Sequence, residues 1–104
     1  MVMRQIMVRY TAKPEAAQEN QRLIEKVFAE LHEKSPEGVR YMVLKLADGG
    51  FVHFSVMDSA EAPNQLQKLE AFQAFQSGVK DRCAEPPKQS DVTIIGDYRM
   101  LRDA

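Results

Sequence analysis

The residue best suited to acid-base chemistry in this sequence is a histidine inside an otherwise apolar segment. His53 lies in the run FVHFSVM, and the unperturbed pKa of an imidazole, roughly 6.5, lets it exchange protons near neutral pH. Such a base can turn an electron-rich aromatic compound into an anion that reacts with oxygen. We expect His53 to be the catalytic residue; the alternative is a structural histidine at a subunit interface.

Phenol and guanidinium groups in three strand-like segments are candidates for binding a ligand, and aromatic residues of a later helical segment are candidates for the walls of a cavity. Neighbouring side chains on a strand point to opposite faces, so these groups cannot all line one pocket. The alternatives are hydrogen bonds at an interface for the polar groups and core packing for the phenylalanines. The candidate substrate-binding residues are Arg9, Tyr10, Tyr41, Phe72, Phe75 and Tyr98.

Other kinds of chemistry have no support in the sequence. Cys83 is the single cysteine, and no metal-ligand spacing, phosphate loop or dinucleotide fingerprint is present, so we expect neither a metal nor a cofactor. The formal net charge is -1, which gives no electrostatic attraction to nucleic acid or to an anionic membrane. The chain shows no signal peptide and no run of about 18 apolar residues. We therefore expect a cytoplasmic protein.

The first half of the chain alternates between strand-like and helical patterns. An alternating segment from Met3 to Thr11 predicts a strand. Apolar residues then recur at helical spacing from Pro14 to Lys34, with charged residues between them. Strand-like runs at Val39 to Ala47 and Phe51 to Met57 flank the sequence Asp48-Gly49-Gly50, which predicts a hairpin.

The second half repeats the order helix then strand. The run LQKLEAFQAFQSGVKDRC predicts one helix from Leu66 through Gly78, ending before Pro86, with Cys83 as a small apolar residue on its inner face. The last strand is expected from Val92 to Leu101 (VTIIGDYRML).

The order β-α-β-β-α-β predicts an α+β ferredoxin-like plait over a single domain, residues 1–104, with both helices on one face of an antiparallel sheet. The strands carry apolar residues at alternate positions on both faces. We assign Val52, Phe54 and Val56 to the helices and His53 to the opposite face. That open face needs a partner, and we expect a homodimer packed sheet against sheet, which would form a dimeric α+β barrel.

Three segments carry a family resemblance: RQIMVRYTAKP, FVHFSVMD and LEAFQAFQSGVKDRCAEPP. Together with the element order they resemble the antibiotic biosynthesis monooxygenase family of the dimeric α+β barrel superfamily, over nearly the whole chain. The resemblance implies cofactor-independent oxidation of phenols or quinols in some members and haem degradation in others. The haem-degrading members use Asn, Trp and His. This chain has no Trp, and Asn20 and Asn64 both lie outside the first strand.

Two functions follow from these observations. The first is a cofactor-independent, monooxygenase-like enzyme that acts on a small aromatic compound. The second is a non-catalytic dimeric module that binds a small ligand or mediates assembly. Polar side chains that converge on a cavity between the sheet and the helices would distinguish the first from a pure assembly module.

Overall fold

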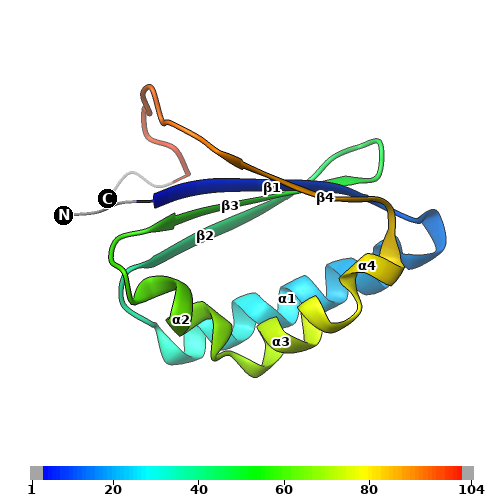
Figure 1. Cartoon of the computed structure of the whole chain (residues 1–104), viewed down its shortest axis with the longest axis horizontal. Helices are drawn as coiled ribbons and strands as arrows, with labels where there is room; N and C mark the ends of the chain where they lie inside the picture. The colour runs from blue at the N-terminus through cyan, green and yellow to red at the C-terminus, as the bar shows by residue number, and fades with distance from the viewer. Residues whose placement is uncertain (1–3, 102–104) are drawn as a thin grey trace.

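The computed structural model describes residues 4–101 and consists of one sheet with helices packed on one of its faces (Figure 1). The strands are β1 (Arg4–Ala12), β2 (Val39–Lys45), β3 (Gly50–Met57) and β4 (Cys83–Asp91). The helices are a short 3-10 turn (Pro14–Ala16), α1 (Ala17–Lys34), α2 (Ala62–Gln67), α3 (Glu70–Ser77) and α4 (Val79–Arg82). The predicted ferredoxin-like α+β plait is therefore confirmed.

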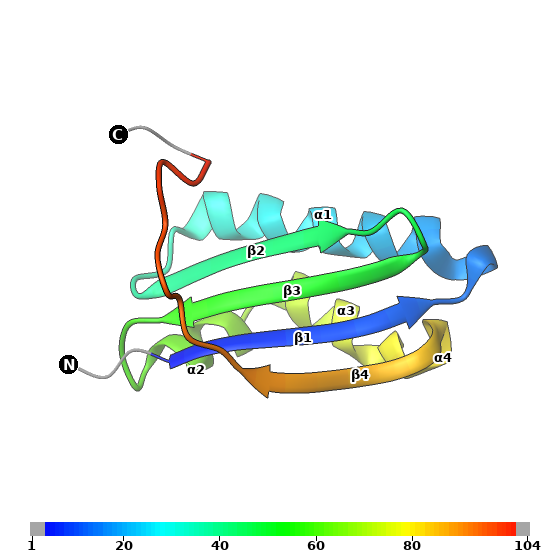
Figure 2. The ribbon, with the colours of Figure 1, turned by 90° about the horizontal axis from the view of Figure 1, so that it is seen from above.

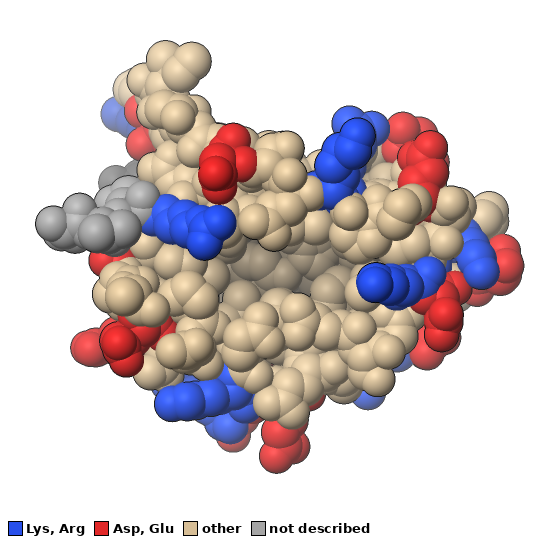
Figure 3. Space-filling view, in the orientation of Figure 1, with Lys and Arg blue, Asp and Glu red and all other residues tan. Residues whose placement is uncertain are grey.

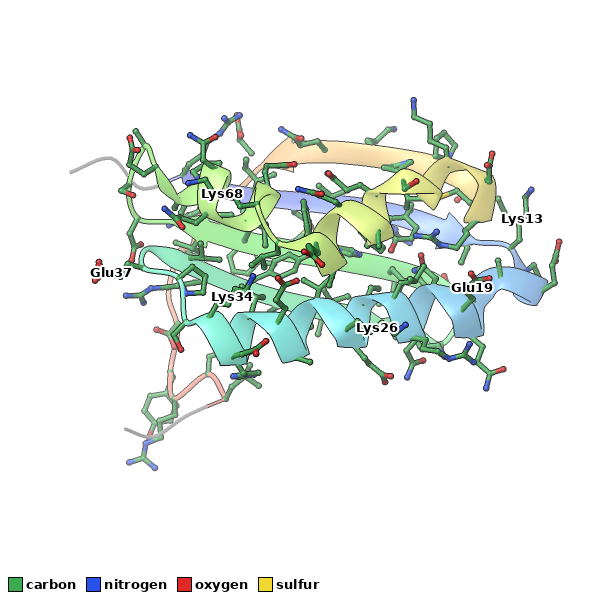
Figure 4. The ribbon with its side chains drawn as sticks, turned by 90° about the horizontal axis from the view of Figure 1, so that it is seen from below. Lys13, Glu19, Lys26, Lys34, Glu37 and Lys68 are labelled. Atoms are coloured by element: carbon green, nitrogen blue, oxygen red, sulfur yellow. The ribbon has the colours of Figure 1, made fainter. Side chains whose placement is uncertain are left out.

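The sheet is antiparallel throughout and has the order β2-β3-β1-β4 (Figure 2). The predicted hairpin joins β2 to β3, and Gly49 adopts a φ of 92° in it, a conformation that favours glycine. Below the sheet, α1 lies beside α3. Figure 4 shows both helices from below, with Lys26 and Lys34 of α1 labelled. The core between these layers includes Val27, Phe51 and Leu69.

The face that β3 turns toward the helices is the opposite of the one predicted. Phe51 and His53 point to the helices, whereas Val52 lies on the open face, where it pairs with Arg9 of β1. Alternation in β3 could not decide this, because both of its faces carry apolar residues. The cations of the neighbouring strands do decide it: a buried, unpaired Arg9 or Arg40 would be costly, so the sheet turns both to the open side.

The single helix predicted from Leu66 to Cys83 is divided into three. Leu69 has extended backbone angles (φ -70°, ψ 128°) between α2 and α3, and Gly78 separates α3 from α4. The predicted inward positions nevertheless pack against the core, and Cys83 is the first residue of β4. A Cβ atom at Gly78 would lie 3.0 Å from an Arg82 guanidinium nitrogen, so glycine here leaves room for that side chain.

The prediction of the last strand at Val92 to Leu101 is wrong, because β4 occupies Cys83–Asp91. Two adjacent prolines made this segment resemble a loop, but β4 lies at the sheet edge, where missing N–H groups are tolerated. The two prolines, Pro86 and Pro87, lie where the pairing of β4 with β1 becomes irregular, between Arg9 and Thr11 of β1. Beyond Asp91 the chain leaves the sheet above its open face (Figures 1 and 2), and Ile95 is 99% exposed.

The amino terminus of α3 is capped from a different helix. The Glu30 carboxylate of α1 accepts hydrogen bonds from the backbone N–H groups of Glu70 and Ala71 and pairs with Lys34 at 2.9 Å. These groups, Lys34 first, lower the pKa of Glu30. The carboxylate therefore satisfies free N–H groups at the positive end of the helix dipole and joins α3 to α1.

Candidate functional site

A cavity of about 190 Å³ lies between the sheet and the helices. In the view of Figure 3 the surface is hollowed between the two layers, and uncharged side chains surround the hollow, while Lys, Arg, Asp and Glu lie around the margin. Most of the lining is apolar, with hydroxyl, imidazole and amide groups among it. The lining residues are Val8, Tyr10, Tyr41, His53, Ser55, Leu66, Phe72, Phe75, Gln76, Val79 and Pro87.

The structure brings five of the seven predicted site residues to this cavity, namely Tyr10, Tyr41, His53, Phe72 and Phe75. Arg9 lies on the open face of the sheet, in a groove with Thr11, Glu85 and Lys88. Tyr98 is 83% exposed in the segment after β4, where Arg99 lies over its ring. The cavity also shows that polar side chains converge between sheet and helices.

His53 is the centre of the polar part of the site. Its Nε2 lies 2.8 Å from the Tyr10 hydroxyl, and its Nδ1 lies 2.6 Å from the Tyr41 hydroxyl. The imidazole ring also packs against Phe75, with the ring centroids 5.2 Å apart. Both ring nitrogens are thus occupied by tyrosine hydroxyls, and the three side chains form a hydrogen-bonded triad, Tyr10-His53-Tyr41.

Burial determines the protonation of this triad. It lowers the pKa of His53 to about 4, because an imidazolium ion would lose its hydration. It raises the pKa of Tyr10 to about 12, against an opposing hydrogen bond from Asn20, and it also raises the pKa of Tyr41. All three groups are therefore uncharged at neutral pH, and His53 is a weaker base than the sequence suggested.

Two residues of the site are not among the candidates from the sequence, Asn20 and Arg82. Asn20 is fully buried on α1; its Nδ2 donates to the Tyr10 hydroxyl at 2.8 Å, and its Oδ1 accepts from Arg82 Nε at 2.9 Å. Arg82 is 8% exposed, donates to the Phe75 carbonyl and lies over the Phe75 ring. The available signal was the position of Asn20, four residues before Ile24 on the apolar face of a helix.

Cys83 does not extend this site as a reactive thiol. It is half-buried and packs against the core. Burial raises the pKa of its thiol, with Arg82 and Lys13 opposing the shift. The thiolate, which is the nucleophilic form, is therefore disfavoured.

Within residues 4–101 no group of three or more His, Cys, Asp or Glu side chains is placed to hold a metal ion. In the same residues no helix is both long and apolar enough to cross a membrane.

Solved structures share this architecture over nearly the full chain. One is the "Putative antibiotic biosynthesis monooxygenase from Nitrosomonas europaea", which is 16% identical, with a TM-score of 0.73 over 89% of this chain and 90% of that one. Another is Rv0793 from Mycobacterium tuberculosis, 15% identical, with a TM-score of 0.75 over 92% and 98% of the two chains. No protein family model and no curated protein matches the sequence.

These similarities define the class of protein by its fold. The chain has the ferredoxin-like α+β fold of the antibiotic biosynthesis monooxygenase structures, as the sequence resemblance implied.

Proposed function

We propose that this protein is a cofactor-independent monooxygenase that oxidises a small, single-ring phenol or quinol in the cavity, with His53 as the central positioning residue of its site. The observation that carries the proposal is the buried Tyr10-His53-Tyr41 triad in the wall of an otherwise apolar cavity. The volume of about 190 Å³ suits one substituted ring, since a cavity of about 150 Å³ is enough for benzene. The names of neighbours with this fold support the reaction class.

The reaction needs no bound cofactor, because the ring supplies every electron that dioxygen takes up. A phenol and dioxygen give a quinone and water: one ring C–H becomes C=O, and the second oxygen atom leaves as water with two hydrogens. The phenol gives up its hydroxyl proton to solvent and binds as the anion, its electron-rich form; the site contributes an apolar path for oxygen and hydroxyl groups that stabilise this anion. His53 acts on that anion by holding the tyrosine hydroxyls in place, because its low pKa makes it unsuited to removing the proton.

Oxygen uptake with a panel of phenols, hydroquinones and catechols tests this function. We expect consumption of one dioxygen per quinone formed with at least one member, and with labelled dioxygen we expect one labelled atom in the product. The alternative, a module that only binds a ligand or mediates assembly, predicts no uptake above the uncatalysed rate with any member. That result would contradict the proposal.

The open face of the sheet supports a second part of the proposal, a homodimer packed sheet against sheet. Met7 of β1, Phe54 of β3 and Met42 of β2 are paired in one row across this face. Leu44, 46% exposed, extends the apolar surface. A second copy of the chain would bury the same surface on both subunits.

Native mass spectrometry tests the dimer. We expect a mass of about 23.6 kDa, twice the 11.8 kDa of one chain. We also expect Phe54→Glu to release monomers, because a charge in the centre of this face would be buried on association. The matched control is Gln18→Glu, a charge added to the exposed surface of α1, which should leave the dimer intact. A monomeric wild-type protein would contradict the shared sheet.

A further inference from the structure

Five buried or half-buried side chains form one continuous series of hydrogen bonds from the end of α4 to the cavity. The contacts run from Arg82 to Asn20 at 2.9 Å, from Asn20 to Tyr10 at 2.8 Å, from Tyr10 to His53 at 2.8 Å and from His53 to Tyr41 at 2.6 Å. The series joins residues from five elements, α4, α1, β1, β3 and β2, and only its last three members line the cavity. Arg82 and Asn20 therefore act on a ligand only through the triad.

The first two members determine the direction of the hydrogen bonds. A guanidinium group has donors and no acceptor, so the Asn20 atom that faces Arg82 must be the carbonyl Oδ1. The amide nitrogen of Asn20 therefore faces Tyr10 and donates to its hydroxyl oxygen. Within residues 4–101, His53 is the only other hydrogen-bond partner of that hydroxyl, so the hydroxyl hydrogen of Tyr10 goes to His53 Nε2.

This direction selects the tautomer of His53. A neutral imidazole that accepts at Nε2 carries its hydrogen on Nδ1, and Nδ1–H then donates to the Tyr41 hydroxyl oxygen. The hydroxyl hydrogen of Tyr41 has no further acceptor among the described residues and is free to point into the cavity. The reverse direction would leave the Tyr10 hydrogen unpaired in a position only 3% exposed, which is unfavourable.

We infer that Arg82 and Asn20 are positioning residues that orient the whole series toward the cavity, so that Tyr41 is a hydrogen-bond donor and the ligand carries an oxyanion on a single ring. This inference rests on the proposed function for its choice of an aromatic ligand. It narrows the substrate to the phenolate or quinolate form. It also gives the positive charge of Arg82 a role, since that charge strengthens each successive donor in the series.

The central test is Asn20→Asp, which should reverse the direction of the hydrogen bonds in the series while nearly preserving the shape of the side chain. A carboxylate can only accept, and the adjacent guanidinium favours its ionised form. Tyr10 would then donate to the carboxylate and accept from His53 Nε2–H, which leaves Tyr41 donating to Nδ1. Two-bond ¹H–¹⁵N correlation spectra distinguish the two tautomers. We expect Nδ1–H in the wild type and Nε2–H in Asn20→Asp, with His32, exposed on α1, unchanged as internal control.

A wild-type His53 protonated at Nε2, or a tautomer that does not change in Asn20→Asp, would overturn the inference. Should Asn20→Asp fail to fold, Tyr41→Phe provides the test, since it removes only the terminal hydroxyl. The probe is 4-nitrophenol, whose absorbance distinguishes the bound anion from the neutral phenol. We expect the wild type to bind the anion and Tyr41→Phe to bind it roughly 10- to 100-fold more weakly.

Preferential binding of neutral 4-nitrophenol by the wild type, or unchanged anion binding by Tyr41→Phe, would overturn the inference. These measurements can fail or succeed independently of the proposed function, because neither the tautomer of His53 nor the absorbance of 4-nitrophenol depends on turnover. An oriented series that binds the anion without any oxygen uptake would sustain the inference and refute the monooxygenase reaction. Oxygen uptake by a protein whose His53 has the opposite tautomer would support the proposed reaction and refute the inference.

Discussion

Replacing His53 with alanine is expected to lower kcat/KM for oxygen consumption by about 100-fold or more. The change removes the group that holds both tyrosine hydroxyls, and loss of one well-placed donor to a developing oxyanion typically costs about 100- to 1,000-fold in rate. The measurement is oxygen uptake with the best substrate of the panel. His32→Ala, the matched change at the other histidine, lies on the exposed surface of α1 and should keep full activity.

His53→Gln tests whether the hydrogen bonds of His53 are what the activity needs, because the glutamine amide keeps one donor group and one acceptor for the tyrosine hydroxyls. We expect it to fold like the wild type and to recover part of the rate lost in His53→Ala. The pKa of about 4 for His53 further predicts that protonation of this residue does not reduce the wild-type rate between about pH 8 and pH 5. Full activity in His53→Ala would refute the assignment.

Replacing Arg82 with alanine is expected to reduce the free energy of unfolding by about 2–5 kcal/mol. Asn20 Oδ1 and the Phe75 carbonyl would each lose a buried donor, at about 1–3 kcal/mol per unsatisfied group. For a domain of this size the melting temperature should fall on the order of 10 °C or more. The measurement is urea unfolding at neutral pH, followed by circular dichroism.

Lys80→Ala is the control for Arg82, because it removes a cation from the exposed surface of the same short helix. It should change the free energy of unfolding by no more than about 0.5 kcal/mol. Arg82→Lys should be intermediate, since an ammonium group cannot reproduce the planar fork that reaches both acceptors. An Arg82→Ala protein as stable as the wild type would show that the buried guanidinium is not needed for the fold.

The sequence was sufficient for the plait because most of its elements show a period or a turn signal of their own. The alternation of β1, the apolar spacing of α1 and the Asp-Gly-Gly hairpin all depend on local chemistry. The fourth strand was misplaced because VTII has the stronger strand preference. At Val92 the chain reaches Gln5, close to the start of β1, and little of β1 remains there to pair with it.

The site was predictable only as far as single residues suggest chemistry. His53, Tyr10 and Tyr41 were identifiable by type, and their meeting depends on the register that places them on one face of neighbouring strands. Asn20 and Arg82 were missed because the contact between them joins positions 62 residues apart. The face on which His53 lies was also undetermined, since it depends on where the charged residues of the neighbouring strands are turned.

The two adjacent prolines of β4 also bear on how copies of the chain can associate. Proline has no N–H to donate, so the outer edge of β4 is a poor template for adding a further strand. Growth of the sheet edge to edge, the route to open-ended fibrils, is thereby discouraged at this side of the molecule. The proposed sheet-against-sheet dimer uses the open face instead, where a two-fold contact would close on itself.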